Sequence, residues 1–325
     1  MSSSVLIMMA TFNSGCFLQK QIDSIIEQSY KNWQLFIQDD CSSDGTFEIL
    51  KNYEKIDSRI KVFVNKNRHG PYRNFHSLIN KCKEENFDYY MFSDHDDIWL
   101  PNKVQTFVDY QNDRNPSLPT LLYANMMLID GNDKSQNQTI DDIFNIKNIK
   151  RVDSFFNHSI YGCNVFFNSS LFKIVPKIDP DSDIAEILCH DNLYVKYASL
   201  FGDLQYIDDI LMNYRRYSSN VTSAHDYNYG YRKVLSSISN IQRLCRAHAR
   251  TYSQTLYMLN LVDKKKLALD SLKFVNDIKK ALMKGGVFGV FIFIKYHVSC
   301  GLRIRTISRA LLLLSGLYKK YLFIC

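Results

Sequence analysis

The strongest constraint on the fold is an alternation, in the first half of the chain, between short apolar runs and segments with helical spacing. Four apolar runs have the length of buried strands, at residues 5–9, 33–38, 60–64 and 89–93. Between them, apolar residues recur at helical spacing over residues 17–28, 47–53 and 74–83. This alternation is typical of a parallel sheet wound by helices, so we predict an α/β fold.

The pattern is weaker in the second half of the chain. It predicts strands at 121–129, 165–167 and 204–207 and a helix at 190–200. Residues 132–150 are polar and weakly patterned, so we expect a loop there.

Polar residues follow three of the predicted strands directly, at 11–13, 39–44 and 94–97. In open α/β sheets, ligands bind outside the carboxyl ends of the strands. Because each polar segment comes at such an end, we expect the three segments to line one edge of the sheet. The sequence therefore predicts a ligand site at that edge.

The third of these segments contains three carboxylates within four residues, from Asp94, Asp96 and Asp97. Like charges this close repel one another unless a cation neutralises them, which indicates a divalent metal site. Carboxylate oxygens suit Mg²⁺ or Mn²⁺, and such ions also bind substrate phosphates. The alternative is a solvated acidic turn that caps a helix opening at Pro101. The apolar neighbours and the position at a strand end favour the metal.

Asp39 and Asp40 form a second acidic pair, at the end of the second predicted strand. A carboxylate there could accept the N3–H of a uracil or thymine ring, which cytosine lacks. Asp40 or Asp44 could equally cap the helix that follows. The residues alone leave both interpretations open.

Six motifs occur in order along the chain: MATFN (9–13), QSYKNWQLFIQDDCSSDGT (28–46), FSDHDDIWLPNKV (92–104), GCN (162–164), HDNLYVKYASLFG (190–202) and YRRYSSNVTSA (214–224). Together they make residues 5–222 resemble the family 2 glycosyltransferases of the GT-A fold. The resemblance is greatest to the bacterial rhamnosyltransferase-like enzymes of O-antigen or capsule synthesis. It implies a GT-A, Rossmann-like mixed sheet flanked by helices.

The resemblance assigns the donor side of the site. Ala10, Thr11 and Asn13 would contact the nucleoside of a nucleotide-sugar, and Asp40 would bind its pyrimidine ring. Arg73, after a Gly-Pro turn, would meet the diphosphate or the sugar, although a surface arginine is an equal alternative.

The resemblance also assigns the reacting end. Asp94 and Asp96 match the family's DxD motif, with Asp96 as the direct metal ligand and Asp94 reaching the ribose or a metal-bound water. Asp191 matches the catalytic base. A metal can stabilise the leaving diphosphate as a Lewis acid, and a carboxylate can take the proton of the acceptor hydroxyl. One base, one metal and no covalent intermediate imply inversion. Asp191 could also cap the helix that starts there.

One position departs from the family pattern. Related sequences often carry a histidine, as a further metal ligand, where this chain has Tyr217. A neutral phenol is a poor substitute for imidazole. Asp96 and the phosphates would then hold the metal alone, or His225 would complete the site.

A basic and apolar segment ends the chain. Residues 278–325 contain nine Lys or Arg and no Asp or Glu. The apolar run at 287–294 is too short to span a bilayer, which takes roughly twenty residues. A set of apolar residues shares one helical face: Ile304, Ile307, Leu311, Leu314 and Tyr318. Such a helix is typical of an anionic membrane surface, with a helix packed on the catalytic domain as the alternative. No nucleic-acid-binding module accompanies the charge, so we expect no nucleic-acid partner.

We therefore predict a GT-A catalytic domain at 1–225 and a helical, membrane-associating C-terminal region at 226–325. The nucleotide-binding part would cover about 1–110 and the acceptor part about 111–225. The eight Cys residues include no CxxC pair, which indicates reduced thiols. We expect a cytoplasmic protein that is peripheral on the inner face of the cell membrane.

The predicted function is an inverting, metal-dependent glycosyltransferase. It would move a hexose or deoxyhexose from a UDP- or dTDP-sugar to a lipid-linked oligosaccharide of a bacterial surface polysaccharide. One rival is a nucleotidyltransferase acting on sugar phosphates, which normally has a Gly-rich basic loop where this chain has MATFNSGC. The other is a non-catalytic membrane-associated binding protein, which would not need Asp96 and Asp191 together.

Overall fold

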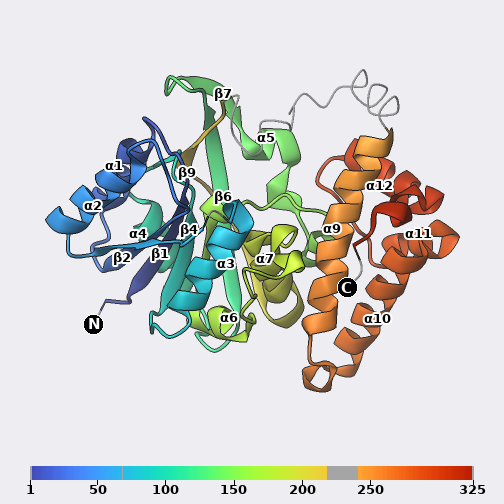
Figure 1. Ribbon diagram of the computed structural model, residues 1–325. Helices are drawn as coiled ribbons and strands as arrows, with labels where there is room; N and C mark the ends of the chain where they lie inside the picture. Colours follow the sequence, from blue (N-terminus) through green and yellow to red (C-terminus); the bar gives the residue numbers. More distant parts are fainter. Residues whose placement is uncertain (1, 68, 218–240, 324–325) are drawn as a thin grey trace. The chain divides into compact units, whose positions relative to one another are not determined.

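The computed structural model describes residues 2–67, 69–217 and 241–323 (Figure 1). The chain divides into two compact units. The first comprises Met1–Ile140 and Ile160–Ser223, and the second comprises Asp141–Ser159 and Ala224–Cys325. Residues 141–159 therefore belong with the C-terminal helices, although in the sequence they interrupt the first unit.

The N-terminal half of the first unit is a parallel sheet, as the alternation of the sequence predicts. β1 (Val5–Thr11) lies between β2 (Trp33–Asp39) and β4 (Tyr89–Ser93), and β3 (Ile60–Val64) pairs with β2. All seven residues of β1 are buried, which explains its continuous apolar run. β2 and β3 lie on one side of β1 and β4 lies on the other, so the strand order reverses at β1. The carboxyl ends of these parallel strands meet at this switch point, where ligands bind in such sheets.

Helices connect these parallel strands: α1 (Leu18–Ile26), α2 (Thr46–Ile56) and α3 (Pro71–Cys82). α3 begins with proline at its first turn, where the missing N–H has no intrahelical partner to lose. Gly70 precedes it with a φ of 85°, a conformation that glycine adopts without strain.

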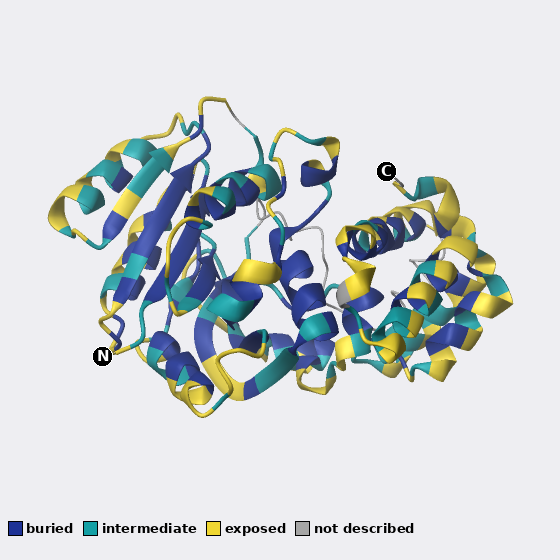
Figure 2. Cartoon of the chain, turned by 90° about the horizontal axis from the view of Figure 1, so that it is seen from below, coloured by how far each residue is buried: buried dark blue, intermediate teal, exposed yellow. Residues whose placement is uncertain are grey.

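The remaining strands complete a mixed, nine-stranded sheet. β8 (Val165–Asn168) is antiparallel to both β4 and β6 (Thr120–Ile129). β9 (Asp203–Arg215) runs parallel to β6 and carries the short antiparallel β5 (Ile98–Trp99) at the edge. β7 (Ser135–Thr139) pairs with β6. In Figure 2 the strands near the N-terminus are largely dark blue, the colour of buried residues.

Further helices in the first unit are α4 (Lys103–Asn112), α6 (Ser169–Ile174) and α7 (His190–Phe201). Two short 3₁₀ helices, η3 (Gly162–Asn164) and η4 (Asp183–Glu186), precede β8 and α7 respectively. α7 is buried along all but its last residue, so its polar first turn lies inside the unit. That burial makes its first residues candidates for a site.

The second unit is helical, with its main helices towards the C-terminus: α9 (Ile241–Leu261), α10 (Leu269–Lys284), α11 (Gly286–Lys295) and α12 (Arg303–Ser315). α5 (Ile140–Phe144) begins its earlier segment. Aromatic rings fill its centre, where Tyr252 and Tyr318 meet edge to face and both are fully buried. Among the described residues, no helix combines the length and apolarity needed to cross a membrane.

Some predicted elements were wrong. The loop expected at 132–150 contains β7 and α5. The β7 residues are polar and largely exposed, because this strand pairs along one edge only, so no apolar alternation marked it. The strand expected at 204–207 extends over all of β9, whose exposed acidic middle hides its pattern. The helix expected from Pro101 begins at Lys103.

Candidate active site

The loops after β1 and β2 are hydrogen-bonded to each other. Thr11 Oγ1 donates to Asp39 Oδ1 at 2.9 Å, across the register in which these two residues are paired. Asn13, with a φ of 45°, donates its N–H to Ser42 Oγ at 2.9 Å, and its Oδ1 accepts the N–H of Ser43. These contacts fix Thr11 and Asn13 at the carboxyl edge of the sheet, which is where the sequence predicts them.

Asp40 lies at the same edge and is fully buried. Its carboxylate accepts hydrogen bonds from Asn65 Nδ2 at 2.8 Å and from the N–H groups of His69 and Gly70 at 2.8 and 2.7 Å. The carboxylate therefore holds the turn before α3 against the end of β2. This role was not among those weighed for Asp40 from the sequence, and the signal for it was the Gly70-Pro71 turn.

Ala10 and Arg73 are two further residues that the resemblance assigns to the donor. Ala10 is buried in β1, and its carbonyl oxygen lies 3.3 Å from His95 Nδ1. Arg73, on α3, donates to the Pro180 carbonyl at 3.1 Å and lies 3.7 Å from Glu186. The arginine thus ties α3 to the segment before α7.

The acidic turn at 94–97 directly follows β4, and the end of β9 holds it in place. The Arg215 N–H donates to Asp97 Oδ1 at 2.9 Å, and Arg215 Nε donates to the Asp96 carbonyl at 2.6 Å. Tyr217 Oη donates to Asp96 Oδ2 at 2.9 Å. The tyrosine that replaces the family's histidine therefore contacts the carboxylate expected to bind metal. His225 lies outside the described residues.

The electrostatics of the turn are those of crowded, buried carboxylates. Burial, together with the charges of Asp96 and Asp191, raises the pKa of Asp94 to about 7. Burial, together with the charges of Asp96 and Asp94, raises the pKa of Asp97 well above its usual value. Lys103 is fully buried and interacts with the charges of Asp97 and Asp94, and burial lowers its pKa to about 7.

The side chains present fit a divalent cation. The oxygens of Asp94 and Asp97 lie within 4.8 Å of each other and of Cys163 Sγ. Asp97 Oδ2 is buried without a hydrogen-bond partner among the described residues. An acceptor in that state is costly, and a cation would satisfy it and relieve the repulsion that raises the two pKa values. Burial raises the pKa of the Cys163 thiol, so a hard oxygen-seeking ion is the better match than a thiolate-bound one.

The segment Gly162–Asn164 joins this turn to Asp191. The Gly162 N–H donates to Asp191 Oδ2 at 2.9 Å. A side chain at Gly162 would lie 2.8 Å from His190 Nε2 and 3.2 Å from Asp191 Cβ, so only glycine allows this approach. The carbonyl of the next residue, Cys163, accepts a hydrogen bond from Lys103 Nζ at 2.7 Å, and its thiol is hydrogen-bonded to Asp94.

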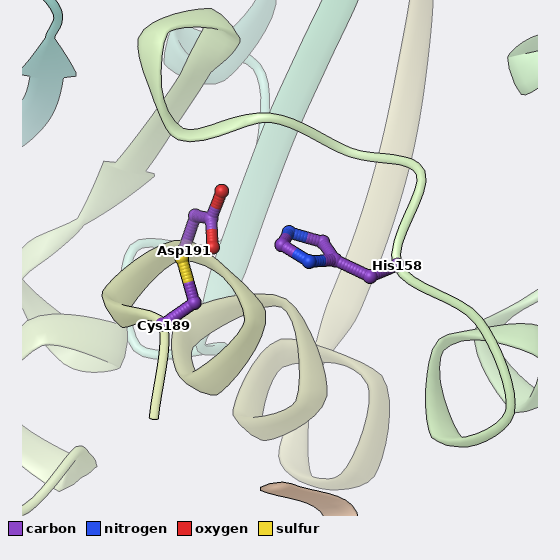
Figure 3. A group of neighbouring side chains, drawn as sticks. All are labelled: His158, Cys189 and Asp191. Atoms are coloured by element: carbon purple, nitrogen blue, oxygen red, sulfur yellow. The ribbon is translucent and has the colours of Figure 1, made fainter. Parts of the chain in front are cut away.

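Asp191 is in the first turn of α7 (Figure 3), and it is buried. Besides Gly162, the Asn192 N–H donates to its Oδ1 at 2.5 Å. Its neighbour His190 stacks on Phe75 with ring centroids 3.7 Å apart. Asp191 therefore contacts the start of its helix, and its charge also reaches Asp94.

The structure thus brings Asp94, Asp96, Asp97 and Asp191 into one acidic site. Thr11, Asn13 and Asp40 lie along the same sheet edge, while Arg73 points to the segment before α7. Sequence reasoning did not assign roles to three residues that shape the site: Lys103, Gly162 and Arg215. The only signal was that each of the three lies in a family motif, Gly162 in GCN, Lys103 in FSDHDDIWLPNKV and Arg215 in YRRYSSNVTSA.

A mixed sheet with an acidic site at the carboxyl ends of its parallel strands is the arrangement of the GT-A fold. The fold is similar to that of a solved mannosyltransferase from Pyrobaculum calidifontis in complex with GDP-Man and Mn²⁺. That match covers 98% of this chain and 88% of the other, with a TM-score of 0.51 and 12% identity.

The sequence comparisons identify the family. The protein-family model described as glycosyl transferase family 2 matches residues 6–174. The dTDP-rhamnosyl transferase RfbG of Shigella flexneri is 30% identical over 252 residues, covering 71% of this chain and 83% of that protein. A UDP-Glc:alpha-D-GlcNAc-diphosphoundecaprenol beta-1,3-glucosyltransferase, WfgD of Escherichia coli, is 33% identical over 129 residues, covering 39% and 47%. The chain belongs to glycosyl transferase family 2, and it is a glycosyltransferase.

Proposed function

We propose that this chain is an inverting, metal-dependent glycosyltransferase of bacterial surface polysaccharide synthesis. It would move a hexose or deoxyhexose from a UDP- or dTDP-sugar to a lipid-linked oligosaccharide. The names of its relatives support a nucleotide-sugar donor, since they include a dTDP-rhamnosyl transferase and a UDP-Glc-dependent enzyme. The name of the second relative also supports an acceptor that is a lipid diphosphate.

One observation carries the proposal: the acidic turn and Asp191 converge on Gly162 and Cys163. Gly162 binds the carboxylate of Asp191, and Cys163 contacts Asp94. Two acidic groups from distant parts of the chain are thereby held at a common point. A transferase needs this combination, because the leaving diphosphate and the attacking hydroxyl lie on opposite sides of the anomeric carbon.

The metal would be held by Asp96 and Asp94, as Mn²⁺ or Mg²⁺. The raised pKa of Asp94 supports a cation at this turn, and the unpartnered Asp97 oxygen, which lies in one group with Asp94, offers a further ligand beside the predicted Asp96. When bound, the ion supplies Lewis-acid stabilisation of the negative charge that develops on the nucleoside diphosphate. The N–H of Arg215 and the hydroxyl of Tyr217 orient the carboxylates of Asp97 and Asp96 for it.

Asp191 would act as the catalytic base. The hydrogen bonds from the Gly162 and Asn192 N–H groups stabilise its anionic form and fix its orientation. An oriented carboxylate can take the proton of an acceptor hydroxyl as that hydroxyl attacks the anomeric carbon. Because the sugar passes directly from donor to acceptor, the configuration at the anomeric carbon inverts.

The donor would lie along the sheet edge. Ala10, Thr11 and Asn13 would contact the nucleoside, and Asp40 the pyrimidine side of the pocket. Asp40 already bonds to the turn before α3, so it would act by shaping the wall of the pocket as well as by meeting the ring. Arg73 would serve the diphosphate or the sugar.

The acceptor and the basic C-terminal segment support a place at a membrane. A lipid-linked acceptor is confined to the bilayer, and residues 278–325 carry only positive charge. We propose that the chain works in the cytoplasm, bound peripherally to the anionic inner face of the cell membrane.

A panel of UDP- and dTDP-sugars, with Mn²⁺, Mg²⁺ or EDTA, tests the proposal. We expect turnover of one donor that EDTA abolishes, with inverted product anomers by NMR. Asp96→Ala and Asp191→Asn should each lower kcat by roughly 10²- to 10⁴-fold. Asp209→Asn, an exposed carboxylate on β9, is the matched control and should leave kcat unchanged. Turnover that persists in Asp96→Ala or in EDTA would overturn the mechanism.

A further inference from the structure

The second unit exposes an unusual number of large apolar side chains on two consecutive helices, α11 and α12. On α11, Val287, Phe291 and Ile294 are 79, 59 and 65% exposed. On α12, Ile307, Leu311 and Leu314 are 60, 59 and 46% exposed. We call these six residues the apolar face.

The apolar face is additional to the side of each helix that packs into the unit. On α11 and α12, the inward residues Ile292, Phe293, Leu312 and Leu313 are buried. The two helices meet closely, since a side chain at Gly289 would come within 2.9 Å of Leu313 Cγ. A helix of a water-soluble unit needs one apolar side, so the second side requires a partner.

The structure narrows the face that the sequence predicts on α12. Tyr318 was expected on the exposed side, but it is fully buried, and its hydroxyl donates to the Leu282 carbonyl at 2.7 Å. It lies in the 3₁₀ turn η6 (Leu317–Tyr321), beyond the end of α12, so the helical spacing no longer applies to it. α11, which the sequence marks only as a short apolar run, supplies half of the apolar face.

Exposed cations lie at the ends of both helices. Lys284 precedes α11 and Lys295 ends it, while Arg303 begins α12 and Lys319 and Lys320 follow it. Lys295 is paired with Asp277, whereas the sequence offers no carboxylate from 278 onwards. The apolar face is therefore bordered by positive charge at each helix end.

We propose that α11 and α12 together form a membrane-insertion surface, in which the apolar face enters the acyl boundary of an anionic bilayer and the terminal Lys and Arg bind lipid phosphates. This inference rests on the proposed function, which places the acceptor in a membrane. The ten residues of α11 are half of what a spanning helix needs, so both helices lie in the plane of the interface.

A second copy of the chain fits this surface less well than a bilayer does. A two-fold symmetric dimer would place the same face of each copy against the other. The basic ends of the helices of both copies would then border one interface, to which residues 278–325 contribute no acidic side chain. The phosphates of anionic lipids supply the missing negative charge, so charge complementarity selects the bilayer.

Vesicle flotation tests the inference with the full chain. We expect binding to vesicles of equal parts phosphatidylcholine and phosphatidylglycerol, and much weaker binding to phosphatidylcholine alone. The double variant Phe291→Ser, Leu311→Ser should lower the partition coefficient by at least about tenfold, because it removes two inserted side chains. The pair Lys319→Gln, Lys320→Gln should weaken binding and reduce its dependence on salt.

Matched controls lie on α2 of the first unit, where Ile56 is 77% exposed and Lys55 is its exposed neighbour. Ile56→Ser and Lys55→Gln should bind vesicles like the unchanged chain. Circular dichroism melting of all variants separates misfolding from lost binding. The inference is overturned if the unchanged chain does not bind anionic vesicles. It is also overturned if the double variant binds them as well as the unchanged chain. A dimer by light scattering that this variant converts to a monomer would also overturn it.

Donor turnover with a water-soluble acceptor, measured on the same proteins, separates this inference from the proposed function. If vesicle binding follows the apolar face while no donor is turned over, the membrane surface stands and the proposed function fails. If a donor is turned over but no vesicle is bound, the transferase activity stands and the membrane surface fails.

Discussion

Gly162→Ala is the most direct test of how the acidic turn and Asp191 are brought together. The new methyl group would lie 2.8 Å from His190 Nε2 and 3.2 Å from Asp191 Cβ. The His190 ring cannot yield easily, because it is stacked on Phe75 at 3.7 Å and packed edge-on against Phe92 at 4.6 Å. The substitution must therefore move the start of α7 away from η3.

The magnitude follows from two effects. Overpacking of a buried site costs about 1–3 kcal/mol, which would lower the melting temperature by a few degrees for a chain of this size. The same displacement lengthens the 2.9 Å bond from the Gly162 N–H to Asp191. Misplacing a catalytic group by about 1 Å can lower the rate by roughly 10²-fold. We expect kcat to fall about 10²-fold with the donor KM nearly unchanged.

Steady-state kinetics with the accepted donor, with thermal unfolding on the same samples, provide the measurement. Gly131→Ala is the control, since its methyl group would lie an ordinary 3.7 Å from the nearest neighbour, Tyr217 Cβ. That variant should keep both kcat and stability. A folded Gly162→Ala enzyme with kcat within about twofold of the unchanged enzyme would refute the view that this contact positions Asp191.

Two further predictions concern the acidic turn. Tyr217→Phe removes the donor to Asp96, so in EDTA the free energy of unfolding should fall by roughly 1.5–3 kcal/mol. The loss should be smaller in saturating Mn²⁺, because the ion gives Asp96 a second partner, and equal losses in both conditions would contradict this. The pKa of Asp94 is about 7 in the folded chain, against an ordinary value of 3.8. In EDTA, ionisation of the folded-state carboxyl is therefore unfavourable, and the free energy of unfolding falls as the pH rises from 3.8 to about 7. Relative to Asp94→Asn, the unchanged chain should therefore lose stability between these pH values by urea titration, and its Mn²⁺ affinity by EPR should rise; parallel curves for the two proteins would count against the raised pKa.

Some features could be predicted from local sequence alone. The parallel half of the sheet was one, because β1, β2 and β4 are largely buried apolar runs whose length and spacing carry their own signal. The polar residues after those strands followed from it, since the carboxyl ends of parallel strands must share an edge. β7 was missed because its residues are exposed and polar, so its only signal is the backbone pairing with β6.

The sequence by itself determined which groups could do chemistry: the carboxylates of the 94–97 turn, Asp191, and a basic end with a short apolar run and one apolar helical face. Only the tertiary structure decided how those groups act. Tyr217 reaches Asp96, Lys103 bonds to Cys163, and Gly162 lets α7 approach, through contacts between residues about 30 to 120 positions apart. Likewise Tyr318 turns inward while Phe291 stays exposed. Whether a side chain is buried or exposed depends on which surfaces the fold brings together, and a local sequence pattern does not contain that information.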